Sequence, residues 1–119
     1  MPDNPESKIE IFFTPEFKRN VRALAKKYPH IHSDLQPLID QLQSGEWVGD
    51  QVQGTGYTIF KVRIRNKDAA RGKSGGYRII YYVKTPMIVI LVTIYSKTEQ
   101  ADISPAQIRK ILAQLTEQE

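Results

Sequence analysis

The stretch that decides the fold is residues 58–65, TIFKVRIR. Apolar and basic residues alternate along it, which is typical of a β-strand with one buried face. The apolar set is Phe60, Val62 and Ile64, and the basic set is Lys61, Arg63 and Arg65. Three like charges on one sheet face repel one another and contribute nothing to folding. The pattern therefore favours a preorganised anion-binding surface over a face that is merely solvated.

The period of two continues on both sides of this stretch. Residues 76–84 and 87–95 predict two more strands, and the short turn between them indicates an antiparallel meander. Arg78 lies early in the first of these strands and can fall on the same face as the basic set. Residues 66–75 are polar and contain glycine, as hairpin connections do. Residues 8–13, KIEIFF, predict a further strand near the N-terminus.

Three segments carry apolar residues at helical spacing, namely residues 15–28, 33–44 and 105–115. Each is preceded or opened by a residue that can cap a helix: Thr14, Ser33 and Ser104. The expected element order is β-α-α-β-β-β-α. We expect an α+β fold in which two N-terminal helices and a C-terminal helix pack on one face of a small antiparallel sheet.

Length and composition place the chain among ordinary globular proteins. Its 119 residues suit one domain, 1–119, of which residues 1–7 are expected to form a disordered tail. There is no cysteine, which excludes disulfides, thiolate metal sites and a cysteine nucleophile. The polar N-terminus does not resemble a signal peptide, and the longest apolar run, 87–94, is too short to span a bilayer. We expect a cytoplasmic protein that does not interact with membranes.

The positive charge is concentrated in one part of the chain. Residues 61–97 contain nine basic residues and one acidic residue, whereas the remainder carries a net charge of −4. Such segregation is typical of a protein with a phosphate-bearing partner. Tyr95, at the end of the last predicted strand, is expected to stack on a base. The full set of expected RNA contacts is Arg65, Lys67, Arg71, Lys73, Tyr95 and Lys97.

Two other motifs do not support a site. Residues 72–74, GKS, match the end of a phosphate-binding loop, but the first glycine of that motif is replaced by Lys67 and a strand follows in place of a helix. His30 and His32 are the only histidines, and they lie in a turn between two helices without a third ligand nearby. We expect no metal and no cofactor.

Three ordered motifs give the chain a family resemblance: residues 60–65, 72–82 and 91–99. Together they resemble the RelE/ParE superfamily of bacterial toxins, and most of all its RelE/HigB-like branch. The resemblance extends from about residue 12 to residue 115. It implies the toxin of a type II toxin–antitoxin pair, a metal-independent, ribosome-dependent endoribonuclease that cuts mRNA in the ribosomal A site. It also implies a cognate antitoxin as partner, with any contact to DNA made only through that antitoxin.

By the same resemblance, Lys61, Arg63 and Arg78 match the catalytic residues of the sheet. The 2′-OH of the RNA would be the nucleophile, and the two arginines would bind the phosphate in the transition state. The surrounding arginines should disfavour the charged form of Lys61, so that its neutral amine could act as the base. The sequence departs from the family at Thr98 and Ser104, where well-studied members have an arginine and a tyrosine.

Two other functions fit the same fold. One is a ParE-like toxin that inhibits DNA gyrase through protein contacts, and the other is a non-catalytic RNA-binding relative. The basic set argues against the gyrase inhibitor, because protein docking does not require a concentrated phosphate site.

Overall fold

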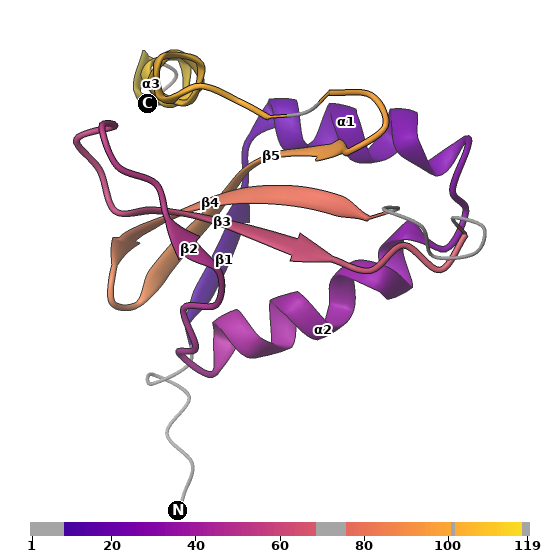
Figure 1. Cartoon of the computed structure of the whole chain (residues 1–119). Helices are drawn as coiled ribbons and strands as arrows, with labels where there is room; N and C mark the ends of the chain where they lie inside the picture. The colour runs from indigo at the N-terminus through magenta and orange to yellow at the C-terminus, as the bar shows by residue number, and fades with distance from the viewer. Residues whose placement is uncertain (1–8, 69–75, 101, 118–119) are drawn as a thin grey trace, which may run out of the picture.

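The computed structural model describes residues 9–68, 76–100 and 102–117. Eight elements follow one another along the chain (Figure 1). In order, they are β1 (Glu10–Phe13), α1 (Pro15–Ala25), α2 (Ile31–Gln43), β2 (Asp50–Gln51), β3 (Ile59–Ile64), β4 (Tyr77–Thr85), β5 (Ile88–Ser96) and α3 (Pro105–Glu117). The expected order β-α-α-β-β-β-α was wrong, because the structure has an additional strand, β2, between α2 and β3. Residues 1–7, predicted to form a tail, lie outside the described residues.

The five strands form one mixed sheet in the order β1-β5-β4-β3-β2. Strands β3, β4 and β5 form the antiparallel meander that the alternation predicted. The expectation of a wholly antiparallel sheet was wrong, because β1 pairs in parallel with β5. A parallel pair needs a crossover connection, and here the connection from β1 to β5 contains both N-terminal helices and the other strands.

The two faces of the sheet are covered by different helices. Helices α1 and α2 pack on one face, over Tyr77, Ile79 and Leu91. Helix α3 packs on the other face, where Ile108 and Leu112 bury Ile59, Ile80 and Val92. The expectation that all helices share one face was therefore wrong. The larger core lies under the two N-terminal helices, and α3 covers only part of the opposite face (Figure 1).

Two of the three predicted capping residues, Thr14 and Ser104, cap a helix in the structure. Thr14 caps α1 by accepting a hydrogen bond from the Phe17 amide at 2.9 Å. The Ser104 hydroxyl accepts from the Gln107 amide at 3.2 Å, while the Ser104 amide donates to the Gln107 side chain at 3.2 Å, so the predicted cap Ser104 forms a capping box with Gln107. Helix α2 begins at Ile31, two residues before the predicted cap Ser33, and its N-cap is His30.

None of the helices in the described ranges is long and apolar enough to cross a membrane.

Candidate functional site

A row of polar side chains crosses three strands on the face that carries α3. Arg63 of β3 is paired with Arg78 of β4, and Arg78 is paired with Tyr95 of β5. Because directly paired residues in antiparallel strands point to the same side, these three side chains share one face. Lys61 lies two residues before Arg63 and therefore also points to this side. We call these four residues the basic row.

Arg63 and Arg78 differ in how they are held. Arg63 is exposed, whereas Arg78 is half-buried and its Nη1 atom is buried with no hydrogen-bond partner among the described residues. A buried guanidinium nitrogen without an acceptor is costly, and an anion seated there would satisfy it. Gly76 lies beside both arginines, and a Cβ atom there would come within 3.6 Å of Arg78 Nη1 and of Arg63 Cγ. Residue 76 is thus in direct contact range of both arginine side chains, and the closest approach of an added Cβ would be to the Ile64 carbonyl oxygen, at 3.0 Å.

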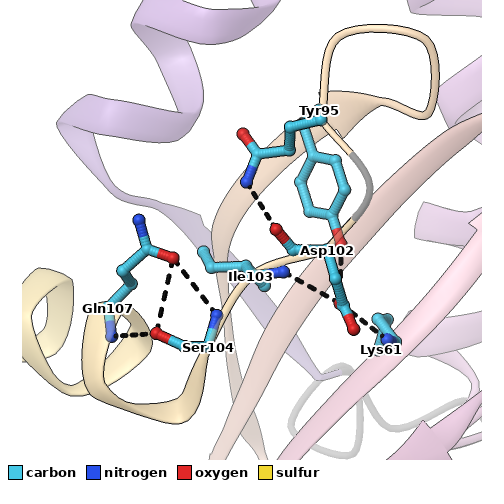
Figure 2. A network of polar contacts seen from close by, with 7 residues as sticks. Lys61, Tyr95, Asp102, Ile103, Ser104 and Gln107 are labelled. Carbon is cyan, nitrogen blue, oxygen red and sulfur yellow. Dashed lines mark hydrogen bonds and ion pairs between the residues drawn. The ribbon is translucent and has the colours of Figure 1, made fainter.

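The third basic side chain of the row has an acidic partner. The Lys61 Nζ atom lies 2.9 Å from Asp102 Oδ1, and the Tyr95 hydroxyl donates to the same oxygen at 3.3 Å. Figure 2 shows both groups directed at the Asp102 carboxylate, Lys61 from β3 and Tyr95 from β5, the two strands that flank β4. The Ile103 amide also donates to this oxygen, at 2.8 Å. Asp102 therefore fixes the segment before α3 against the basic row.

This contact changes the expected role of Lys61. The sequence led us to expect a neutral amine, because three arginines were thought to surround it. The structure instead gives Lys61 a carboxylate partner, which stabilises the charged ammonium. On the other side of the pair, the hydrogen bond from Lys61 is the main cause that lowers the pKa of Asp102. Asp102 is therefore a carboxylate at neutral pH, and Lys61 donates a hydrogen bond to it.

Tyr95 is more enclosed than the sequence suggested. Its relative exposure is 5%, so in this conformation its ring is not presented to solvent for base stacking. Burial is the largest cause that raises the pKa of its phenol to about 12, and the charge of Asp102 adds to the effect. Arg78 opposes the rise, because a nearby cation favours the phenolate. The hydroxyl is thus a neutral donor that helps to orient Asp102.

The other expected RNA contacts are more scattered. Arg65 follows the end of β3 and, with Lys67, lines a pocket of about 320 Å³ against α2, away from the basic row. Lys97 is exposed, and its amide donates to the Gly76 carbonyl at 3.2 Å, which places its backbone near the arginines. Arg71 and Lys73 lie outside the described residues.

The positions at which the sequence departs from the toxin pattern have structural roles. Thr98 forms a hydrogen bond with Ser96 through their hydroxyls, at 2.8 Å. Ser104 is the N-cap of α3. Neither residue supplies a charge or a ring to the basic row.

The two histidines do not meet at a metal site. His30 Nδ1 lies 2.7 Å from Asp68 Oδ1, and the His30 amide donates to the other oxygen of that carboxylate at 2.8 Å. These contacts, first of all the side-chain hydrogen bond, lower the pKa of Asp68. In the part of the chain that the structure describes, no three His, Cys, Asp or Glu side chains are grouped as they would be around a metal ion.

Asp102 is the site residue that sequence reasoning missed. It lies outside the alternating strands and follows a basic stretch, so neither periodicity nor charge counting singles it out. Its position just before Ser104-Pro105, a helix-start signal, was the one available sign that it would be held in a fixed place.

No protein-family model matches this chain.

Proposed function

We propose that this protein is the toxin of a type II toxin–antitoxin pair and that it cleaves mRNA in the ribosomal A site. Two things support this: the resemblance to RelE/HigB-like toxins in three ordered motifs, and the basic row. The observation that carries the proposal is the buried Nη1 atom of Arg78, which has no hydrogen-bond partner in the part of the chain that the structure describes, directly across from exposed Arg63. Two guanidinium groups side by side are suited to binding one phosphate.

In the proposed reaction, the 2′-oxygen of the RNA attacks the adjacent phosphorus and the bond from phosphorus to the 5′-oxygen breaks. The products are a 2′,3′-cyclic phosphate and a free 5′-hydroxyl. Arg63 and Arg78 neutralise the charge that builds up on the phosphate oxygens. The substrate would have to enter the open part of this face that α3 leaves uncovered.

The ion pair between Lys61 and Asp102 suggests how the two protons are handled. Asp102 is a carboxylate at neutral pH and can accept the proton of the 2′-hydroxyl. Lys61 is an ammonium in this pair and can donate a proton to the departing 5′-oxygen. Lys61 would then act as the general acid, in place of the base role that the resemblance implied.

The same proposal includes a location and partners. A ribosome-dependent nuclease acts in the cytoplasm, and we propose a cognate antitoxin that neutralises the positive charge of the basic row with acidic residues. The RelE-like topology is part of this proposal.

The experiment compares single-site variants in a cleavage assay on ribosomes with a defined A-site codon, with cut 5′ ends mapped by primer extension. Arg63→Ala and Arg78→Ala should each slow cleavage by a factor of about 100 to 1,000, because each removes one preorganised charge contact in the transition state. Arg19→Ala removes an equal charge from exposed α1 and should cut at the wild-type rate. Equal rates for all four proteins would contradict the proposal.

A second substrate separates the chemistry from the binding. An mRNA with a 2′-deoxy sugar at the cleavage site should bind but remain intact, because the nucleophile is missing. Intact transcripts with wild-type protein, together with arrested growth, would instead favour the gyrase inhibitor.

A further inference from the structure

A second surface lies on the other side of the sheet, between α1 and α2. It is a groove of about 410 Å³, lined by ten residues. They are Phe13, Phe17, Lys18, Val21, Arg22, Ala25, His32, Leu35, Gln36 and Ile39. Both helices pack on the face opposite the basic row, so this groove is separate from the candidate site and does not depend on the function proposed for it.

The floor of the groove is apolar and is not completely covered. Phe17, Val21 and Leu35 are buried in the core beneath it, while Phe13 at its mouth is 37% exposed. The Phe13 and Phe17 rings lie 5.5 Å apart, so one exposed ring continues the buried apolar surface outward. An exposed ring next to an apolar groove is a typical feature of a binding surface.

The rim of the groove is positively charged. Lys18 and Arg22 are four residues apart on α1, and both are exposed along one wall. The opposite wall, on α2, presents His32 and Gln36, and the Gln36 amide is hydrogen-bonded to Asp40 at 2.9 Å. Glu16, the acidic residue in the first turn of α1, is engaged by Arg19 and Thr93. Positive charge therefore predominates along the wall that α1 provides.

We propose that this groove binds an acidic amphipathic helix of a partner protein. An apolar floor between two helices accepts side chains spaced at i, i+3, i+4 and i+7, as in other helix-in-groove complexes. Lys18 and Arg22 would pair with Asp or Glu beside those anchors. A second copy of this chain is a poor occupant, because it would bring the same positively charged wall against itself. The partner would leave the basic row on the other face accessible.

The test uses a library of amphipathic peptides of about 14 residues, which span roughly 21 Å as helices. Their apolar positions are fixed, and the flanking positions are drawn from Glu, Gln and Lys. Selection against the full chain should enrich Glu at the flanks. The best peptide should bind Lys18→Glu/Arg22→Glu at least tenfold more weakly than the wild-type protein.

The matched control is Arg19→Glu/Lys26→Glu, which makes the same charge change at exposed positions of α1 and its C-cap that do not line the groove. It should bind the peptide within about twofold of wild type. Equal losses of peptide affinity in both double variants would overturn the proposal, because they would show that the peptide responds only to the net charge of the protein. Enrichment of Lys or Gln flanks, or displacement of the peptide by an oligoribonucleotide, would also overturn it. So would a dimer of this chain that the groove variant alone disrupts.

Discussion

At the scale of single residues, the informative feature is how one carboxylate is held. Asp102 accepts hydrogen bonds from Lys61, Tyr95 and the Ile103 amide at the same oxygen, although its side chain is 61% exposed. A residue that served only to cap a loop would not need a lysine and a tyrosine from two strands. In the proposed reaction, Asp102 repels the phosphate in the ground state and accepts a proton in the transition state.

These two effects give Asp102→Asn opposite consequences. Affinity for an oligoribonucleotide should rise severalfold, because a negative charge next to the phosphate is removed. Cleavage on the ribosome should fall by a factor of about 100 or more, because the amide cannot accept the proton. Anisotropy titration and the cleavage assay measure the two effects separately. Cleavage at the wild-type rate would show that Asp102 only positions Lys61.

At the scale of elements, the edge strand β2 depends on a glycine. Gly49, just before β2, has a φ of +98°, and a Cβ atom there would lie 2.4 Å from the Lys61 carbonyl oxygen. The neighbouring Val48 carbonyl accepts a hydrogen bond from the Tyr81 hydroxyl. The turn before β2 thus lies against the Lys61 backbone in β3 and is hydrogen-bonded to β4.

Gly49→Ala should therefore lower the free energy of unfolding by at least about 2 kcal/mol, because it combines an unfavourable φ with a clash against backbone. Gly56→Ala is the matched control, since Gly56 has a φ of +81° but nothing within 4 Å of the added Cβ. It should cost only about 1 kcal/mol. Urea unfolding followed by circular dichroism gives both values, and equal losses would show that the close approach to Lys61 is unimportant.

The elements also show what sequence patterns can predict. Alternation predicted β3, because one of its faces lies in the large core, whereas β5 was recognisable as a continuous apolar run that is buried on both faces. The short turn between β4 and β5 predicted their antiparallel pairing. The two-residue strand β2 is too short to show a period. The parallel pairing of β1 with β5 and the placement of α3 depend on contacts between distant segments, which a local pattern does not contain.

The same distinction applies to the candidate site. Arg63 and Arg78 could be placed together because strand alternation and a hairpin fix their register. Asp102 could not be placed beside the basic row from the sequence, because its position depends on how the chain turns back after β5. The enclosure of Tyr95 also escaped prediction, because a strand tyrosine at the end of a sheet is exposed or buried according to the segment that covers it.

At the scale of the whole molecule, charge is divided between two surfaces on opposite faces of one sheet. The basic row faces the side of α3, and the groove with its positively charged rim lies between α1 and α2. If RNA binds through the row, the affinity should depend on salt through a small number of phosphate contacts.

We expect log K for a single-stranded oligoribonucleotide to fall with log salt with a slope of about −2, as for roughly three phosphate contacts. Arg63→Ala should reduce the slope by about 0.7. Lys26→Ala, which removes one exposed charge from the other side of the sheet, should leave it unchanged. Equal changes in both variants would indicate that RNA responds to net charge and not to the row.

Stability at high pH should also reflect the site. The pKa of Tyr95 is raised to about 12, mainly by burial. The pKa of Tyr95 in the folded protein thus exceeds the value of about 10 for an unfolded tyrosine. The neutral phenol therefore contributes fully to the free energy of unfolding below pH 10, and this contribution is lost as pH rises toward 12. Unfolding free energies measured by urea at pH 8 and pH 11 should show a drop that is smaller in Tyr95→Phe. If the wild-type protein and Tyr95→Phe lost the same unfolding free energy, the loss would be assigned to Tyr77 and Tyr81, whose pKa values burial also raises.

The parallel pairing of β1 with β5 has a consequence for how the protein is made. The Thr14 hydroxyl, next to β1, donates to the Val92 carbonyl in β5, 78 residues later in the chain. During synthesis β1 therefore cannot pair within the sheet until β5 has been synthesised. The basic row needs β5 as well, and its partner Asp102 lies beyond that strand. A nascent chain thus acquires the site only after residue 102 has been synthesised, so a growing copy that stops before this residue carries no finished site.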